Sequence, residues 1–172
     1  MTVEILKIIF RFFILIGLQV LILNNVQLSG FINPYLYILF ILLLPVKFPK
    51  ALVLVLGFIS GLTVDMFTNT MGMHAAATTA MAFARPYILK LFSPRDGYEA
   101  EAVPNIKDFG LNWFLVYVST LVFFHHVILF YVEVFRLSDF FSTLMRALLS
   151  SVLTLLLIFI TQFLFGKAKL ER

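Results

Sequence analysis

The stretch from Leu54 to Lys90, LVLGFISGLTVDMFTNTMGMHAAATTAMAFARPYILK, holds two apolar runs separated by a short polar turn. Its one acidic residue is Asp65, and small residues recur along it at helical spacing. Gly57, Gly61 and Asp65 are spaced four apart, so on a helix they share one face. Glycines in this pattern let two helix backbones approach closely inside a membrane. That face therefore meets another helix rather than lipid, either within this chain or in a partner protein. We expect Gly57, Gly61 and Asp65, with Gly72 after the turn, to form this helix-packing or partner interface.

The composition around this stretch is that of a membrane protein. The chain has 172 residues, of which 62% are hydrophobic and 13% are charged, and its mean hydropathy is +1.03. Soluble domains carry about twice that share of charged residues. Long apolar stretches without charges indicate membrane spans. The chain has no cysteine, which excludes disulfides, thiolate nucleophiles and cysteine metal sites.

We expect one all-α transmembrane domain, residues 1–172, with six spans and both termini in the cytoplasm. The expected spans are residues 4–24, 31–46, 51–67, 72–92, 110–135 and 139–165. The second is the weakest, because its apolar core, PYLYILFILLLPV, would form only about 20 Å of helix against a hydrocarbon thickness of about 30 Å. It either re-enters the membrane or spans with help from the residues before it.

The positive charges support six spans. With the N-terminus inside, all but two of the 13 Lys and Arg residues lie on the cytoplasmic side, the exceptions being Arg136 and Arg146. The net charge of +4 thus encodes orientation, and nucleic acid is not an expected partner. The largest loop, residues 93–109, is then cytoplasmic, and its Pro, Gly and charged residues predict a mobile, surface-exposed segment.

Placing an aspartate at the centre of a membrane helix costs about 2.5–3.5 kcal/mol of insertion free energy. The presence of Asp65 in an apolar segment therefore needs a structural or functional explanation. One interpretation is that it ends its segment or bonds the turn FTNTMG that follows. The other is an intramembrane ion pair with Arg146, which lies at a similar depth from the outer side. We therefore state the Asp65–Arg146 ion pair as a hypothesis.

The sequence offers little catalytic chemistry. It contains no nucleophile-elbow serine, HExxH motif, phosphate-binding glycine loop or aspartate cluster. His74, His125 and His126 could suggest a metal site, but adjacent histidines on a helix point about 100° apart and chelate poorly. We expect these histidines to pack as polar residues, and we expect no enzyme, cofactor or metal.

The end of the stretch, Arg85-Pro86-Tyr87, is expected on the cytoplasmic side. Pro86 should kink or end its helix, since it lacks an N–H and clashes with the preceding turn. Arg85 should extend to the inner head groups, and Tyr87 should lie at the interface as an aromatic anchor. The same three residues could also form a contact surface for a protein.

Taken together, these features resemble the MreD family of bacterial rod-shape proteins, in a branch similar to that of Bacteroidetes. The resemblance covers the whole chain and rests on short motifs: GLTVDMF with Gly61 and Asp65, Gly72 after the turn, the Ala-rich HAAATTAMAFA, and RPY at residues 85–87. The segments NPYLYILFILLLP and FSPRDGYE strengthen it.

The resemblance implies a multi-pass protein of the bacterial inner membrane that acts as a scaffold and not as an enzyme. Its implied partners are MreC, a single-pass protein with a periplasmic domain, and the elongation complex of MreB, RodA and a class B penicillin-binding protein. The implied role is to help position peptidoglycan synthesis. The implied fold is similar to that of the substrate-binding subunits of energy-coupling-factor vitamin transporters, with six helices around a central cavity.

That similarity leaves a second hypothesis open, a solute-binding subunit of a transporter. Its site would use the polar residues of the outer half, namely Asp65, Asn69, His74, His125 and Arg146. Such subunits often carry an Ala-rich first helix for contact with the energising module. The first segment here, IIFRFFILIGLQVLIL, is bulky, which favours the scaffold.

Overall fold

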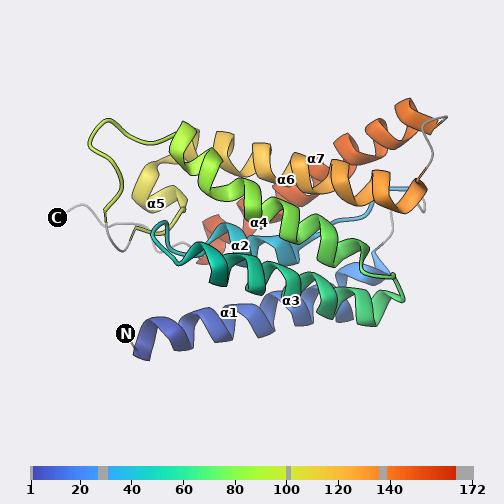
Figure 1. Cartoon of the computed structure of the whole chain (residues 1–172), viewed down its shortest axis with the longest axis horizontal. Coiled ribbons are helices and arrows are strands. Elements are labelled where there is room, and N and C mark those ends of the chain that lie inside the picture. Colours follow the sequence, from blue (N-terminus) through green and yellow to red (C-terminus); the bar gives the residue numbers. More distant parts are fainter. Residues whose placement is uncertain (1, 27–30, 100–101, 136–138, 166–172) are drawn as a thin grey trace.

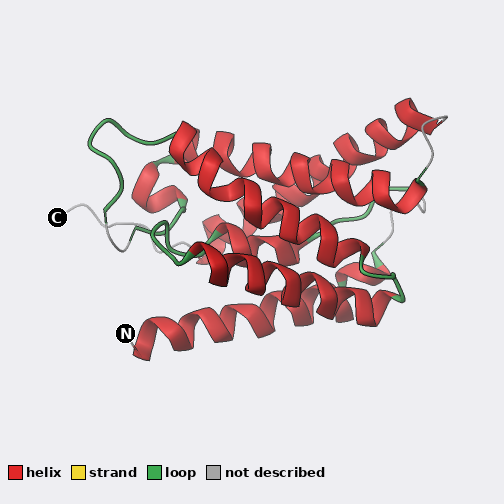
Figure 2. Ribbon diagram, viewed as in Figure 1, coloured by secondary structure: helices red, strands yellow, loops and turns green. Residues whose placement is uncertain are grey.

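A computed structural model describes residues 2–26, 31–99, 102–135 and 139–165. Over these residues the chain is helical and has no β-strand (Figure 2). The five long helices are α1 (Thr2–Leu21), α3 (Lys50–Thr68), α4 (Met73–Leu91), α6 (Leu111–Val134) and α7 (Phe140–Phe165). The short ones are η1 (Leu23–Asn25), η2 (Leu36–Ile38), α2 (Leu39–Leu42) and α5 (Ile106–Phe109), where η marks a 3₁₀ helix.

Four stretches are helical, long and apolar enough to cross a membrane. They are Ile5–Asn25, Lys50–Thr68, Leu111–Val134 and Phe140–Phe165. Their outer faces carry large exposed apolar side chains, such as Phe10 at 66% and Leu164 at 71% exposure. An apolar surface of this extent suits contact with lipid. The protein is therefore an all-α membrane protein.

The long helices run along the same axis, so the bundle has two ends (Figure 1). We call one the basic end, which holds residues 45–50 and the loop 92–110. The positive residues in these segments are Lys47, Lys50, Arg95 and Lys107, and Lys90 lies next to them in the last turn of α4. We call the other the turn end, which holds residues 22–26, 31–33 and 69–72.

The predicted second span, residues 31–46, is the core of the bundle. It is not a continuous helix: residues 33–35 are irregular, η2 and α2 together cover only Leu36–Leu42, and turns follow. Every residue from Tyr35 to Leu44 is at most 8% exposed. Irregular backbone at membrane depth is tolerated only where protein surrounds it. We refer to residues 33–45 as the central segment.

The glycine face of α3 packs within the chain, against α4. A Cβ built on Gly61 would lie 2.5 Å from Ala75 Cα, and one built on Gly57 would lie 2.9 Å from Ala82 Cβ. Distances this short leave no room for a side chain at position 57 or 61 of α3. The intramolecular interpretation of the GxxxG pattern therefore describes this face, and the partner-docking interpretation does not. Gly72, the residue before α4, has φ +81°, a backbone conformation that favours glycine. A Cβ built on it would meet nothing within 4 Å, so Gly72 serves the turn and is not part of the packed face.

α4 continues through Pro86 to Leu91. The prediction that Pro86 could end this helix is wrong. Proline inside a membrane helix is tolerated because neighbouring groups can satisfy the backbone that it leaves unpaired. α4 packs against both α3 and α6, so it has neighbours on two sides.

The described part of the loop 92–110 is fastened to the bundle. Tyr98 donates its hydroxyl to Leu89 O at 2.7 Å, and Trp113 donates its indole N–H to Phe92 O at 2.7 Å. Val46 N also donates to Ala102 O at 2.9 Å. Burial raises the pKa of the Tyr98 phenol above its ordinary value. The loop thus shields the basic end of the core.

Candidate functional site

Polar side chains of the surrounding helices satisfy the backbone of the central segment. Gln19 is fully buried on α1; its side-chain amide donates to Pro34 O at 3.0 Å and accepts from Tyr37 N at 3.3 Å. On α7, Thr154 Oγ1 accepts from Tyr35 N at 3.0 Å. These bonds replace the helix hydrogen bonds that irregular backbone lacks, and each buried backbone group left unpaired would be costly.

Two arginines and a tyrosine bind the carbonyls at the other end of the segment. Arg11 donates to Leu43 O at 2.9 Å. Arg85 donates to Leu44 O through Nη2 and to the Tyr117 hydroxyl through Nε, the latter at 3.0 Å. Tyr117 in turn donates to Leu42 O at 3.0 Å. These carbonyls lie at and just after the C-terminal end of α2, where a cation is electrostatically favourable.

The expectation that Arg85 extends to the head groups is therefore wrong. The side chain is 2% exposed and is turned into the bundle, because the unpaired carbonyls of the central segment lie there. Tyr87, two residues on, is 61% exposed, as an interfacial anchor would be. The three residues Arg85-Pro86-Tyr87 thus do not form one surface.

A cluster of aromatic and hydroxyl side chains lies at the start of the central segment. The Tyr37 hydroxyl is 2.7 Å from Thr78 Oγ1, 3.0 Å from His125 Nε2 and 3.2 Å from His74 Nδ1. All four of these residues are buried. His125 Nδ1 has no hydrogen-bond partner among the described residues. The cluster joins α4, α6 and η2 through one phenol.

His126 faces α7 instead. Its Nδ1 lies 2.8 Å from Val122 O, which can only accept, so Nδ1 is the donor. Its Nε2 lies 3.1 Å from Thr154 Oγ1 and can accept that hydroxyl proton. The adjacent histidines thus serve different neighbours. No group of three or more described histidine or acidic residues is placed to hold a metal ion.

Asp65 bonds the turn after its helix and the start of α4. Oδ1 accepts from Thr70 Oγ1 at 2.5 Å and from His74 N at 3.0 Å, and Oδ2 accepts from Ala75 N at 2.8 Å. The first N–H groups of a helix have no partner within it, and a carboxylate there is stabilising. Of the two interpretations of Asp65, the turn interpretation describes this geometry.

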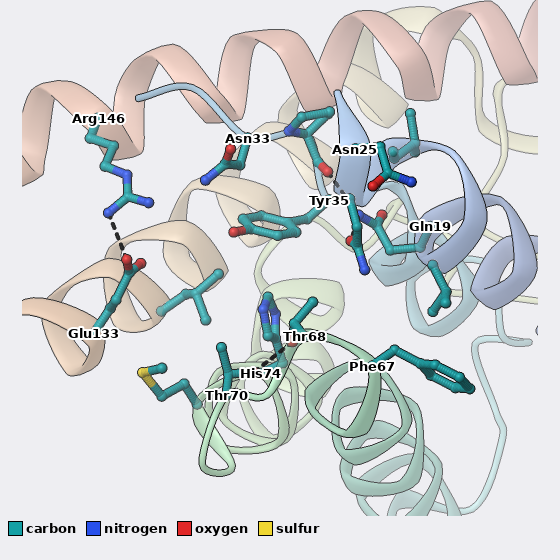
Figure 3. A pocket seen from close by; sticks show the side chains of 16 residues that line it. Gln19, Asn25, Asn33, Tyr35, Phe67, Thr68, Thr70, His74, Glu133 and Arg146 are labelled. Carbon is teal, nitrogen blue, oxygen red and sulfur yellow. Dashed lines mark hydrogen bonds and ion pairs between the residues drawn. The ribbon is translucent and has the colours of Figure 1, made fainter. Parts of the chain in front are cut away.

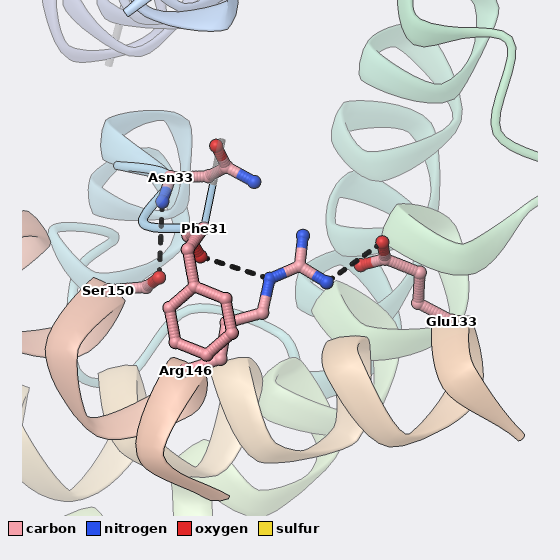
Figure 4. A network of polar contacts seen from close by, with 5 residues as sticks. All are labelled: Phe31, Asn33, Glu133, Arg146 and Ser150. Atoms are coloured by element: carbon pink, nitrogen blue, oxygen red, sulfur yellow. Dashed lines mark hydrogen bonds and ion pairs between the residues drawn. The ribbon is translucent and has the colours of Figure 1, made fainter. Parts of the chain in front are cut away.

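The hypothesised Asp65–Arg146 pair is wrong. Arg146 on α7 forms an ion pair with Glu133 on α6, with Nη1 2.9 Å from Oε1. Its Nε donates to Phe31 O at 3.1 Å (Figure 4). Its guanidinium also lies 4.2 Å from the centre of the Phe130 ring. Similar depth did not bring the two charges together, because Asp65 faces α4 while Arg146 faces α6.

A cavity of about 380 Å³ opens at the turn end. Figure 3 shows Arg146, Glu133, Asn33, Tyr35 and His74 around it, with Gln19 and Asn25 on the α1 side. Its wall combines an ion pair with amide, hydroxyl and imidazole groups, so it can form many hydrogen bonds. Pockets of 300–1,000 Å³ hold small ligands in other proteins. We call it the turn-end pocket and take it as the candidate binding site.

The structure brings together only part of the polar set predicted for a solute site. His74 and Arg146 line the turn-end pocket. Asp65 is 3% exposed behind the α3–α4 turn, and Asn69 ends α3 in a left-handed conformation with φ 55°. His125 is fully buried beneath Tyr37. None of these last three lines the pocket.

Sequence reasoning missed the residues that hold the central segment, above all Gln19, Tyr117, Thr154 and Tyr37. Each is a single polar group inside an apolar run. A polar residue in a membrane helix needs a partner inside the protein. The isolated polar residues in the apolar runs were therefore the signal that could have identified this set. The partner here is backbone on another segment, which no sequence spacing reveals.

Comparison with known proteins found no match: no family model, no curated protein and no solved structure is similar to this chain.

Proposed function

We propose that this protein is a non-enzymatic scaffold subunit of the bacterial cytoplasmic membrane, of the MreD type. In this role it binds an MreC-like single-pass protein and helps the elongation complex of MreB, RodA and a class B penicillin-binding protein to position peptidoglycan synthesis. The proposal rests on the sequence motifs given above and on how the interior of the bundle is used.

The observation that carries the proposal is the commitment of interior polar groups to the protein's own backbone. Gln19, Arg11, Arg85, Tyr117 and Thr154 all bond the central segment. Asp65 is likewise engaged by α4. Groups used in this way hold a rigid frame, whereas an active site needs groups that converge on a substrate. A rigid frame with an apolar outer surface suits a scaffold.

The proposed topology has six crossings with both termini in the cytoplasm. α4 is as long as α3, at 19 residues, and the central segment runs alongside α1 in the opposite direction, with Gln19 near Pro34 and Arg11 near Leu43. These two would join the four apolar helices. The positive-inside rule then assigns the basic end, with Lys47, Lys50 and Lys107, to the cytoplasm.

A second function, a solute-binding subunit of a vitamin-type transporter, is favoured by one observation, the turn-end pocket. Its volume of about 380 Å³ suits a small molecule. Glu133, Arg146 and Asn33 on its wall could bind charged and amide groups of a solute.

Affinity purification of the tagged protein from its native membrane in mild detergent separates the two functions. The scaffold predicts co-purification of a single-pass protein with a periplasmic domain, together with wall-synthesis enzymes. Recovery of an ATPase pair and a coupling subunit instead would contradict the scaffold and favour the transporter.

A matched pair of variants then tests the turn-end pocket. Met73→Trp would fill it without removing a side-chain hydrogen bond, while Met71→Trp changes a fully exposed side chain outside it. Loss of the partner with Met73→Trp alone would place the contact at the pocket. Retention of the partner with both variants would leave the scaffold in place and locate its contact elsewhere.

A further inference from the structure

A second cavity, of about 400 Å³, opens at the basic end. It lies between the start of α3 and the last turns of α4, and it is lined on one side by Lys47, Pro49 and Lys50 and on the other by Ala82 and Arg85. None of the described residues that line it is acidic. It is distant in the fold from the turn-end pocket and is not used by the proposed function.

No acidic side chain among the described residues pairs with the positive charges at this cavity. The side chains of Lys47 and Lys50 are exposed and form no ion pair or hydrogen bond with any described residue. Elsewhere in the bundle, the positive charge of Arg146 is paired with Glu133. Three cations around one hollow repel one another unless an anion joins them. The site is thus complementary to negative charge.

Arg85 supplies a buried donor to the same hollow. Its Nε and Nη2 are used by Tyr117 and Leu44, but Nη1 has no hydrogen-bond partner among the described residues. The fully enclosed side-chain atoms without a partner are His125 Nδ1 and Ser151 Oγ in the described part of the chain, and Nη1 is not one of them. Nη1 therefore retains some exposed surface, in keeping with the place of Arg85 in the cavity wall.

The start of α3 adds backbone donors. Its first hydrogen bond to a preceding carbonyl is from Val53 N to Pro49 O, so the N–H groups of residues 50–52 have no partner of this kind. Pro49 offers no side-chain cap, and the first turn has no acidic residue. The positive end of the helix dipole is thus free to attract an anion, and phosphate groups are commonly bound in this way.

We propose that this cavity binds the phosphate of an anionic phospholipid head group. The charged groups stand at the end of a membrane bundle, where head groups lie, and basic pockets at this level are known to hold anionic lipids. The wall between the charges is apolar, with Val46, Phe48 and Val53. Leu52 and Val55 lie on the outward face of α3 and are exposed and apolar, as expected of residues that face lipid beside such a site. This inference is independent of the scaffold proposal.

Native mass spectrometry of the purified protein tests the site, with phosphatidylglycerol, phosphatidylethanolamine and inorganic phosphate as separate probes. The test variant is Lys47→Gln/Lys50→Gln, in which both substituted side chains are exposed. The control is Lys90→Gln/Lys107→Gln, which removes the same charge near the same end but outside the cavity. Thermal unfolding of each variant checks that the fold is retained.

We expect preferential binding of phosphatidylglycerol that falls at least about tenfold in the test variant and little in the control, since the test variant removes two of the cations that attract the head group. Equal loss in both variants would overturn the site, because the attraction would then be general. Equal binding of phosphatidylethanolamine would also overturn it. Inorganic phosphate that binds alone, and only with Lys47 and Lys50 present, would identify a soluble anion and overturn the lipid as its source.

Discussion

Arg85 and Tyr117 come from different helices, lie 3.0 Å apart, and each donates to the central segment, Arg85 at Leu44 O and Tyr117 at Leu42 O. Both side chains are almost fully buried. Together they link α4 and α6 to the end of a short helix that cannot satisfy its own carbonyls. This relationship makes the bundle depend on interior polar contacts as well as on apolar packing.

We predict that Arg85→Met destabilises the protein by about 1–3 kcal/mol, because it leaves the Leu44 carbonyl buried without a partner. Lys90→Met on the same helix removes an exposed charge and should have little effect. Equilibrium unfolding in mixed micelles would measure both. Equal stability of Arg85→Met and the parent protein would mean that the carbonyls find other partners.

We predict that Gly61→Ala destabilises the protein by about 1–3 kcal/mol, since the new methyl group would lie 2.5 Å from Ala75 Cα and would force α3 and α4 apart. The neighbour is backbone and cannot turn aside. Gly17→Ala is the matched control, because a methyl group there meets nothing within 4 Å. The same unfolding measurement applies, and a Gly17→Ala cost as large as that of Gly61→Ala would show that glycine is needed for another reason.

The α3–α4 hairpin could be predicted from the sequence for a physical reason. Gly57 and Gly61 favour close approach of a neighbouring helix, and the next helix in the chain follows after a turn of a few residues. The ends of the long helices also agree with the predicted spans to within a few residues. The reason is that the length of an apolar helix has to match the thickness of the membrane, so the end of the apolar run marks the end of the helix.

The central segment could not be predicted in the same way. The shortness of its apolar run indicates that it is not an ordinary span, but the almost wholly apolar sequence from Tyr35 to Leu44 does not show where the backbone is irregular. What decides its conformation is supplied by Gln19, Tyr117 and Thr154, far away in the sequence. The Asp65–Arg146 hypothesis failed for a related reason: depth in the membrane can be counted along a helix, but the direction a side chain faces depends on how the helices pack.

We predict that Asp65→Ala lowers stability by about 0.5–2 kcal/mol, the usual cost of losing a helix cap, because His74 N and Ala75 N lose their acceptor. Asp65→Asn should recover part of this, since one amide oxygen can still accept. Asp96→Ala changes an exposed acid in the loop and serves as the control. Hydrogen exchange at the first turn of α4 should rise in Asp65→Ala alone; unchanged exchange there would contradict the capping role.

We predict that a double-mutant cycle of Arg146→Ala and Glu133→Ala yields a coupling energy of about 0.2–1 kcal/mol, as expected for a partly exposed ion pair. The pair is 16% and 37% exposed, so the coupling should weaken as salt is added. A parallel cycle of Arg146→Ala with Asp65→Ala should give no coupling, because Asp65 is bound to the start of α4 and Arg146 to α6. Unfolding of the four proteins in each cycle, at low and high salt, supplies both values. Coupling in the second cycle but not in the first would restore the Asp65–Arg146 pair and contradict the geometry described here.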